Sequence, residues 1–342
     1  MEIGVVMLGG LSDGVGNAVA DGFRASGCGA VPLLSNREWP GRLDLIVIPG
    51  PMQPLTSLIA RFGRVQGLPP VAVWFTEQTP NPMWSPAFVA RVADLRWGLD
   101  WCAGSRIAAR VPLGSQLLAG LSGKAGRLRL LGELRFLLKS SRLSLLAVFT
   151  GSNARFLYKF GLSSVRVPMG YHPSFGRLLG KDRDIDVVFL GSTRDRRRRR
   201  LIRGLSGRMN ELGIRFVIRD GSPEHGSAHG EERVNLLNSA KIMLSIMRQP
   251  WDDPVFRILL AAPNGAMVLS EQVCDAGPFK PGEHFAAARL DDLVEAIRYY
   301  LANDSARREI ANTAYDFVTR HLTMEQMASG LLSEFEARRR TG

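Results

Sequence analysis

The sequence predicts an α/β protein with two Rossmann-like domains, because short apolar strands alternate with helices and because this alternation begins twice. Continuous apolar strands separated by helices are typical of parallel sheets that are covered on both faces. The segment from Leu290 to Leu301 instead shows the helical period, with one apolar stripe. The strand-like runs are Ile3–Leu8, Leu45–Ile48, Val71–Phe75, Leu145–Phe149, Val165–Val167, Asp186–Leu190, Arg215–Ile218, Ile242–Ile246 and Ala266–Leu269.

The two starts are marked by glycine-rich turns after a first strand. Ile3–Leu8 leads into a turn that contains Gly9 and Gly10, and Asp186–Leu190 leads into Gly191-Ser192-Thr193. The stretch 168–184 between the two series is rich in Pro, Gly and charge, which is typical of a linker. We therefore expect one domain over residues 1–170 and a second over 171–322.

Composition fits a globular chain rather than a disordered one, with 342 residues, 45% hydrophobic and 22% charged. The three cysteines are scattered without a CxxC spacing, which predicts a reducing cytoplasm and no structural zinc. The opening segment MEIGVVMLGG lacks the features of a signal peptide, and no apolar stretch is long enough to span a membrane. The expected location is therefore cytoplasmic.

The net charge of +12 predicts an anionic partner: a nucleotide, a nucleic acid or an anionic membrane. The charge is concentrated in two places. Between Gly104 and Arg166 there are eleven Lys or Arg and one acid, Glu133. The second cluster consists of Arg194 and Arg196 through Arg200.

The second cluster surrounds the turn Gly191-Ser192-Thr193, where a helix is expected to begin. The amino end of a helix carries about half a positive charge, so arginines there are unfavourable unless an anion offsets them. A phosphate or diphosphate would do so, and Gly191, Ser192 and Arg194 are the expected contacts. For Arg196 to Arg200 a solvated helix face is an equally good explanation.

An ordered series of residues in the second half resembles a known family. It contains Asn238-Ser239-Ala240-Lys241-Ile242, Asp252, Arg257, Gly265-Ala266, FKPGEHF at 279–285 and HLTMEQMASGLL at 321–332. This series resembles the C-terminal donor-binding module of GT-B fold glycosyltransferases, in the branch of the spore-maturation-protein-like and glycosyl transferases group 1 families. The resemblance covers about 230–332 well and 184–230 loosely.

The resemblance implies a GT-B enzyme that uses a nucleoside-diphosphate sugar as co-substrate and no further cofactor. It makes Asn238, Asp252, Arg257 and Gly265 donor-binding residues, and it implies a retaining reaction. It also implies that residues 323–342 form a C-terminal helix that crosses back to the first domain. Asp252 could instead be a turn acid, and Arg257 could instead form a structural salt bridge.

Metal independence is expected because the chain offers Arg194, Arg257 and a helix that begins near Pro263–Gly265 or earlier for the diphosphate. One position departs from the family. The family has an acid, seven residues, and then a Glu that holds the ribose of the donor. Asp252 fits the acid, but Leu260 stands where the Glu should be, and leucine cannot bind a diol.

The first domain should supply the acceptor side of the reaction. Glu77 follows the strand Val71–Phe75 in the string VAVWFTEQTPNP, which makes it a candidate catalytic or acceptor-binding carboxylate or a structural cap. Asp13, with Gly9 and Gly10, belongs to the first-strand loop that faces the cleft in GT-B folds, and it could also be an ordinary loop acid. His172 is a third catalytic candidate, with a structural role as its alternative.

Residues 124–149 mix leucines with Lys and Arg. A helix over this stretch would be apolar on most of its surface, which suits either a core helix with basic ends or a surface for anionic lipid. The stretch 104–166 is therefore a candidate contact with the inner face of a membrane.

Three functions compete on this sequence. A glycosyltransferase with a glycan, lipid-linked or small-molecule acceptor is favoured. A degenerate GT-B protein that binds a nucleotide or partner without catalysis is supported by Leu260. A nucleic-acid-binding protein fits the charge, but no RNA- or DNA-binding motif is recognisable.

Overall fold

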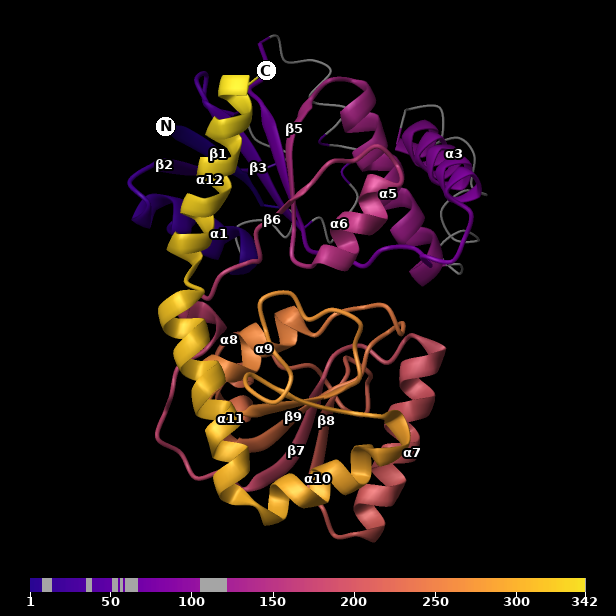
Figure 1. Ribbon diagram of the computed structural model, residues 1–342, viewed down its shortest axis with the longest axis vertical. Coiled ribbons are helices and arrows are strands. Elements are labelled where there is room, and N and C mark those ends of the chain that lie inside the picture. The colour runs from indigo at the N-terminus through magenta and orange to yellow at the C-terminus, as the bar shows by residue number, and fades with distance from the viewer. Residues whose placement is uncertain are drawn as a thin grey trace. The chain divides into compact units, whose positions relative to one another are not determined.

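The computed structural model describes residues 1–7, 14–34, 39–50, 55, 58, 67–104 and 122–341, and it divides the chain into two units. The N-terminal domain comprises Met1–Pro168 and Met324–Gly342, and the C-terminal domain comprises Met169–Thr323. These boundaries lie within two residues of the ones expected from the sequence. Each domain contains one sheet, and all neighbouring strands in both sheets run parallel (Figure 1). The predicted α/β class with two Rossmann-like domains is therefore confirmed.

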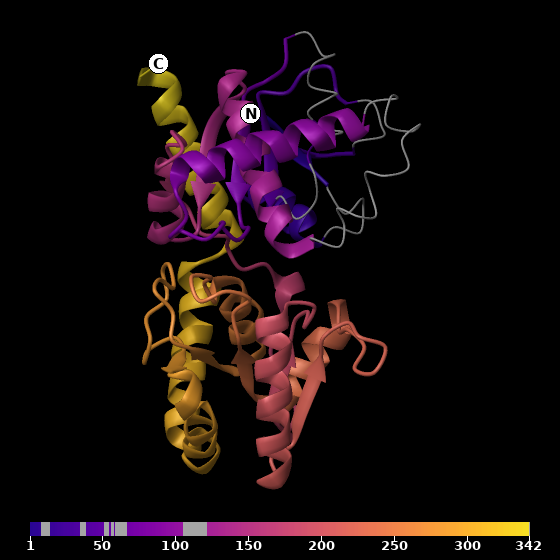
Figure 2. The same ribbon diagram turned by 90° about the vertical axis from the view of Figure 1, so that its right-hand side faces the viewer.

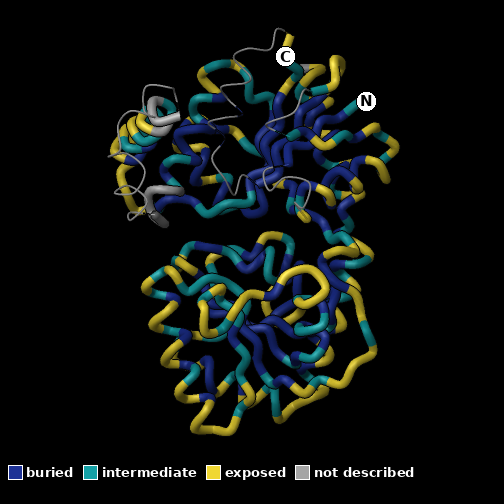
Figure 3. The backbone as a smooth tube through the Cα atoms, turned by 180° about the vertical axis from the view of Figure 1, so that it is seen from behind, coloured by how far each residue is buried: buried dark blue, intermediate teal, exposed yellow. Residues whose placement is uncertain are grey.

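The sheet of the N-terminal domain has six strands in the order β2-β1-β3-β4-β5-β6. Its strands are β1 Glu2–Val6, β2 Gly29–Leu33, β3 Leu45–Gly50, β4 Val71–Phe75, β5 Leu143–Val148 and β6 Val165–Arg166. The described helices of this domain are α1 Gly14–Ala25, α3 Pro86–Gly104, α5 Ser122–Lys139, α6 Gly151–Tyr158 and α12 Met324–Thr341. Strands β3 and β4 are buried along their whole length, which explains their unbroken apolar sequences (Figure 3).

The leucine-rich basic stretch 124–149 is not one helix. Helix α5 ends at Lys139, Ser141 adopts a positive φ of 53°, and the chain turns into β5. Leu131, Leu134 and Leu137 of α5 are buried in the core of the domain, with at most 2% of their surface exposed. The described part of α5 is therefore a core helix, the first of the two alternatives that the sequence left open.

Helix α12 returns to the N-terminal domain and packs on α1. Ser26 Oγ, just after α1, donates to the backbone oxygen of Glu325 at 3.1 Å, and Ser329 Oγ donates to Ser26 Oγ at 3.0 Å. Gly22 makes this contact close, because a Cβ there would lie 2.6 Å from Cγ of Met324. Among the described residues, no helix is long and apolar enough to cross a membrane.

The sheet of the C-terminal domain has five strands in the order β11-β10-β9-β7-β8. They are β7 Ile185–Leu190, β8 Phe216–Arg219, β9 Ala240–Ser245, β10 Met267–Glu271 and β11 Ala286–Ala288. The helices are α7 Arg196–Glu211, α8 Gly230–Ser239, α9 Val255–Ala261, α10 Leu293–Ala302 and α11 Asp304–Asp316. Shorter turns are the 3-10 helices η3 Pro173–Phe175, η4 Ala262–Asn264 and η5 Leu290–Asp292 and the π-helical turn η6 Phe317–His321.

Each connection in this sheet leaves a strand at the carboxyl edge and enters the next strand at the amino edge. Because the strands are parallel, the segments after β7, β8, β9 and β10 all begin at the carboxyl edge, where ligands of open α/β sheets bind. The segments that lead into β9 and β10 lie at the amino edge. Right-handed crossovers place α7 on one face of the sheet and α8 and α9 on the other.

Two strands were not predicted from the sequence. Strand β2 contains Pro32 and lies at the edge of its sheet, and β11 is the short run Ala286–Ala288 at the edge of the other. Proline and alanine are both uncommon in strands, and edge strands need little apolar sequence because one side has no partner.

Candidate functional site

The turn after β7 lies at the carboxyl edge of the C-terminal sheet. The Gly191 N–H donates to the Arg219 oxygen at 3.1 Å, and the φ of Gly191 is 138°, in the region that favours glycine. Asp195 caps α7, because its Oδ1 accepts from the backbone N–H groups of Arg197 and Arg198 at 3.0 and 3.3 Å. The turn thus begins a helix with its N–H groups near the strand end, as the sequence predicted.

Helical geometry separates the five consecutive arginines that begin α7. Successive residues of a helix point about 100° apart, so a run of five covers the whole circumference. Arg198 is fully buried and Arg197 is half-buried, whereas Arg196, Arg199 and Arg200 are exposed. The five arginines therefore have different surroundings, and each group of them needs its own explanation.

Arg197 is neutralised by a buried carboxylate. Its Nη1 and Nη2 contact Oε1 and Oε2 of Glu271 at 3.0 and 2.5 Å, and only 4% of Glu271 is exposed. Arg197 Nη1 also donates to the Met247 oxygen at 2.8 Å, while the Met247 N–H donates to Glu271 Oε1 at 2.5 Å. Hydrogen bonding to Glu271 raises the pKa of Arg197 above its ordinary value, so this bidentate pair ties α7 to the ends of β9 and β10.

Arg198 has no such carboxylate among the described residues. Its Nη1 donates to the Ser192 oxygen at 3.1 Å and its guanidinium lies 5.8 Å from the ring centre of Phe189, but Nε and Nη2 have no hydrogen-bond partner. Burial, followed by the charges of Arg257 and Arg248, lowers the pKa of Arg198 to about 8. The charged form is therefore strongly disfavoured by its own surroundings.

Arg257 approaches the same turn from α9. A Cβ at Gly191 would lie 3.4 Å from Nη1 of Arg198 and 3.9 Å from Nη2 of Arg257. The Nε of Arg257 is buried without a hydrogen-bond partner in the described chain, and Nη1 reaches Sδ of Met247 at 3.6 Å. Burial and the charge of Arg248 lower the pKa of Arg257 to about 10. The two guanidinium groups therefore converge on the backbone of Gly191.

Neither arginine forms an ion pair with a described residue, and the charges of Asp252 and Asp195 only partly offset the effect of burial on the pKa of Arg198. Two guanidinium groups in this arrangement are chemically suited to an anion. With pKa values of about 8 and about 10, Arg198 and Arg257 are both mainly protonated at neutral pH, so the two positive charges persist and repel each other. An unpaired buried charge is costly, and a bound phosphate would neutralise both groups through charge-assisted hydrogen bonds. A departing diphosphate would gain the most from this arrangement, because its charge grows as the bond to its sugar breaks.

The loop before α9 carries two acids. Asp252 is buried, and its Oδ2 accepts from the Gln249 N–H at 2.9 Å, so it does shape the turn. Asp253 Oδ1 accepts from the Val255 N–H at 3.0 Å, and burial raises the pKa of Asp253 to about 6. Helix α9 begins at Val255, earlier than Pro263, which lies in the turn η4 that follows it. Leu260 is buried on α9, so this position offers no carboxylate.

A pocket of about 290 Å³ adjoins the turn, between the ends of β7 and β8 and the start of α8. The predicted residues Gly191, Ser192 and Arg194 line it. Asp220 also lines it, and its pKa is lowered to about 2: burial alone would raise it, but hydrogen bonds from Ser222 and Thr193 outweigh burial. Arg194 is exposed and does not share the buried position of Arg198.

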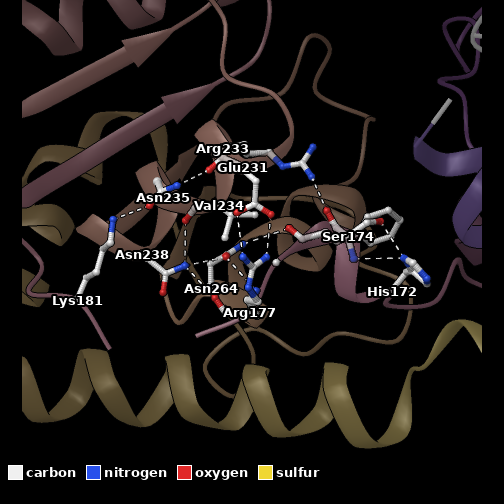
Figure 4. A network of polar contacts seen from close by, with 12 residues as sticks. His172, Ser174, Arg177, Lys181, Glu231, Arg233, Val234, Asn235, Asn238 and Asn264 are labelled. Carbon is white, nitrogen blue, oxygen red and sulfur yellow. Dashed lines mark hydrogen bonds and ion pairs between the residues drawn. The ribbon is translucent and has the colours of Figure 1, made fainter. Parts of the chain in front are cut away.

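Asn238 and Gly265 lie at the amino edge of the sheet, away from the turn at Gly191, because they lead into β9 and β10. Asn238 Oδ1 accepts from the Leu179 N–H at 2.8 Å, and its Nδ2 donates to Asn264 Oδ1 at 2.9 Å (Figure 4). Gly265 has a φ of 69° and closes η4, where a Cβ would lie less than 3 Å from the side chain of Arg183. Both residues lie against the segment 169–184.

The residues that the sequence assigned to the acceptor side lie in different surroundings, and some are outside the described part of the chain. Glu77 is half-buried directly after β4, at the carboxyl edge of its sheet, where the sequence placed it. His172 caps η3, since its Nδ1 accepts from the Ser174 N–H at 3.2 Å, which is the structural alternative for this residue (Figure 4). Gly9, Gly10 and Asp13 lie outside the described residues.

Arg198 and Glu271 were not singled out from the sequence. A signal for Arg198 was present, because it shares a helical stripe with the buried residues Ile202, Leu205 and Met209. An arginine on the apolar stripe of a helix is either paired or part of a site. Glu271 ends an apolar strand, and only the fold shows which arginine it meets.

The comparisons with known proteins concern the family and the fold. Residues 194–333 match a family model described as "Glycosyl transferase-like". A search of the curated proteins finds no match. This match covers less than half of the chain, and it confirms the resemblance to glycosyltransferases that was drawn from the sequence.

Among solved structures, HepE of Anabaena in complex with UDP and glucose has a TM-score of 0.58 at 9% identity, over 98% of this chain and 100% of HepE. A glycosyltransferase from Rickettsia africae ESF-5 has a TM-score of 0.50 at 11% identity, over 100% of this chain and 99% of that protein. TarM, an S. aureus protein, has a TM-score of 0.51 at 9% identity, and the match covers 85% of this chain but about half of TarM, 54%. The two-domain fold is that of the GT-B glycosyltransferases.

Proposed function

We propose that the protein transfers a sugar from a nucleoside-diphosphate sugar, and that Arg198 and Arg257 hold the diphosphate at Gly191. The observation that carries this proposal is the convergence of two guanidinium groups that have no carboxylate partner among the described residues. Their positive charge is already in place when negative charge develops on the leaving diphosphate, so little reorganisation is needed. The adjoining pocket at Ser192 and Asp220 is then available to the nucleoside.

Several finer features belong to the same proposal. Because arginines supply the positive charge, we propose that the reaction needs no metal. The resemblance to the family favours a hexose or related sugar and a retaining outcome. UDP-glucose is the first donor to test, because the HepE structures of the same fold contain UDP and glucose or UDP-glucose.

The acceptor side rests on the N-terminal domain. Glu77 stands at the carboxyl edge of its sheet, which favours a role in binding or activating the acceptor. The acceptor class, whether a glycan, a lipid-linked sugar or a small molecule, stays a prediction. So do the cytoplasmic location and an association of the stretch 104–166 with an anionic membrane surface.

A second candidate function is a GT-B protein that binds a nucleotide without catalysis. Leu260 favours it, because this buried leucine cannot bind the ribose of a donor. Hydrolysis of the donor separates the two candidates: slow release of UDP from UDP-glucose is expected of a transferase, while nucleotide binding without any release would favour the second candidate.

The donor site is tested by a single substitution. Arg257→Ala should weaken UDP-glucose binding about a hundredfold, because one of two charge-assisted contacts to the diphosphate is lost. Isothermal titration calorimetry measures this, after a screen of UDP, GDP, ADP and dTDP sugars by thermal shift has identified the best donor. The matched control is Arg298→Ala, an exposed arginine on α10 that pairs with Glu295.

Unchanged donor affinity in Arg257→Ala would exclude Arg257 from the site. If instead no nucleotide stabilises the protein and a random oligonucleotide binds with a steep dependence on salt, the nucleic-acid alternative replaces the proposal.

A further inference from the structure

A groove lies between α7 and the loop that follows β8. Its volume is about 580 Å³, which is the size of a small-molecule site. Arg199 and Arg203 of α7 line it, with Ser222 and His225 of the loop and with Ile202 and Ile218. Figure 2 shows α7 standing beside β8 and its loop. This groove shares Arg194, Asp220 and Gly221 with the smaller pocket at Gly191 but does not include Gly191, Arg198 or Arg257.

The arginines of the groove have no carboxylate partner in the described chain. Arg199 and Arg203 are exposed, and neither takes part in an ion pair with a described residue. With Arg196 and Arg200 they form like-charge neighbours three or four residues apart, which disfavour a helix. Arg196 and Arg199 also lie in the first turn, where the helix dipole is already positive. Such an arrangement is expected where a ligand supplies the missing negative charge.

Two acids line the groove, Asp220 and Glu224, and both contact residues of the loop. Thr193 Oγ1 donates to Asp220 Oδ2 at 2.5 Å, the Ser222 N–H donates to Asp220 Oδ1 at 2.9 Å, and the His225 ring lies 3.4 Å from the same oxygen. Glu224 Oε1 lies 3.8 Å from Nε2 of the same His225 ring. Both acids therefore contact the loop, and among the described residues neither forms an ion pair with Arg199 or Arg203. Ser222 Oγ and Nδ1 of His225 lie 3.2 Å apart and add polar groups on the side of the groove that faces α7.

The shape and lining of the groove select the kind of ligand. Ile202 and Ile218 add apolar surface to a wall of arginines, which suits a phosphate group attached to a ring or carbon chain. A bilayer surface cannot enter a groove, and the exposed residues between the arginines of α7 include Gly204 and Gly207 rather than apolar anchors. The lining contains no Trp, Tyr or Phe on which nucleic-acid bases could stack.

We propose that this groove is a second anion site, which binds a phosphorylated small molecule through Arg199 and Arg203, separately from the diphosphate held by Arg198 and Arg257. The proposal goes beyond the sugar transfer and does not depend on it, because the groove has its own arginines and its own loop. It explains why exposed arginines such as Arg199 and Arg203 of α7 have no carboxylate partner among the described residues.

Inorganic pyrophosphate is the probe that counts the sites. Isothermal titration calorimetry of the full chain should show two sites. The double variant Arg199→Ala, Arg203→Ala should weaken one of them by about tenfold or more, while Arg257→Ala weakens the other. Loss of exposed like charges should leave the fold intact, which circular dichroism checks. The matched control is Arg196→Ala, Arg200→Ala, which removes the same charge from α7 but does not touch the groove.

Two results would overturn the proposal. The first is that pyrophosphate binds at one site only and that Arg257→Ala abolishes this binding. That result would support the proposed donor site and would show that the groove binds no pyrophosphate. The second is an equal loss of pyrophosphate affinity in the control variant, which would show that the anion binds to a diffuse charged surface. If the protein also binds vesicles of phosphatidylglycerol and phosphatidylcholine, and this binding depends on Arg196 and Arg200, that surface is a membrane contact. Tighter binding of phenyl phosphate than of inorganic phosphate would support a contribution from the apolar residues of the groove, and equal binding would contradict it.

Discussion

Helices α5 and α7 are both rich in basic residues, yet the fold treats them differently. On α5, Arg135 and Lys139 contact Asp94 of α3 at 2.9 and 3.0 Å, and Arg127 donates to Gln78. On α7, Arg197 has its carboxylate in Glu271, whereas Arg198 is buried without one in the described chain. A basic run that the fold neutralises serves stability, and one that the fold leaves unneutralised indicates a ligand.

The sharpest form of this comparison is within α7, between two adjacent arginines. Arg197 and Arg198 are both removed from water, but the pKa of Arg197 is raised by Glu271 and the pKa of Arg198 is lowered by burial and by neighbouring arginines. The same substitution at the two positions should therefore have opposite effects on stability.

The largest effect is expected at Arg197. Arg197→Met leaves Glu271 as a buried carboxylate without its cation and should lower the free energy of unfolding by about 3 kcal/mol. Urea denaturation measures this. The double variant Arg197→Met, Glu271→Gln should recover part of the loss. A loss well under about 1 kcal/mol would show that the pair is not the tie between α7 and the strand ends.

At Arg198 the same change should stabilise the fold and weaken donor binding. Arg198→Met removes an unpaired buried charge, so the free energy of unfolding should rise by about 1 kcal/mol without ligand. Donor affinity should fall about a hundredfold, as for Arg257→Ala. Urea denaturation and calorimetry on one preparation test both effects. A variant that is less stable than the parent and binds the donor normally would show that Arg198, like Arg197, serves stability.

A smaller effect is expected at Asp253, whose pKa of about 6 lies above the ordinary value of 3.8. Since folding favours the protonated carboxyl, its contribution to stability is complete below about pH 4 and is lost as the pH rises through 6. Asp253→Asn removes this dependence and should be more stable than the parent by about 1 kcal/mol at pH 8. Thermal denaturation should show a difference in stability between the variant and the parent at pH 8 but not at pH 4. Equal differences at the two pH values would contradict the raised pKa of Asp253.

The smallest effect is expected on the exposed face of α7. Arg200→Glu turns two like-charge neighbours, Arg196 and Arg203, into opposite-charge pairs and should stabilise the protein by about 0.5 kcal/mol at low salt. The gain should shrink in high salt, because exposed charges are screened. A loss of stability on this substitution would mean that the face is not under like-charge strain.

Most of the fold was predictable because buried parallel strands are unbroken apolar runs. Every one of the nine predicted strands corresponds to a strand of the structure, and the two that were missed are edge strands with Pro32 or alanines. The end of α5 was not predictable from hydrophobicity, because the leucines continue into β5 and only the backbone at Ser141 separates them.

The candidate site was only partly predictable. Turn residues such as Gly191 and the family residue Arg257 are local signals, and both lie at the site. Asn238 and Gly265 share the same family series but lie at the other edge of the sheet, because a linear motif does not state which edge a residue reaches. Arg198 was hidden because five arginines in a row look alike until the helix assigns each a direction.

The C-terminal domain has one further property that follows from its two ends. The Tyr171 N–H donates to the Leu322 oxygen at 2.7 Å, and Tyr171 forms a β-bridge with Thr323, so the chain enters and leaves this domain at one point. Asn264, which holds the entering segment through its bond to the Phe175 oxygen at 3.3 Å, also donates to the Leu260 oxygen of α9 at 2.8 Å. A module whose ends meet can be exchanged between proteins as a cassette, and the natural cut for such an exchange lies before Met169, not at the start of β7.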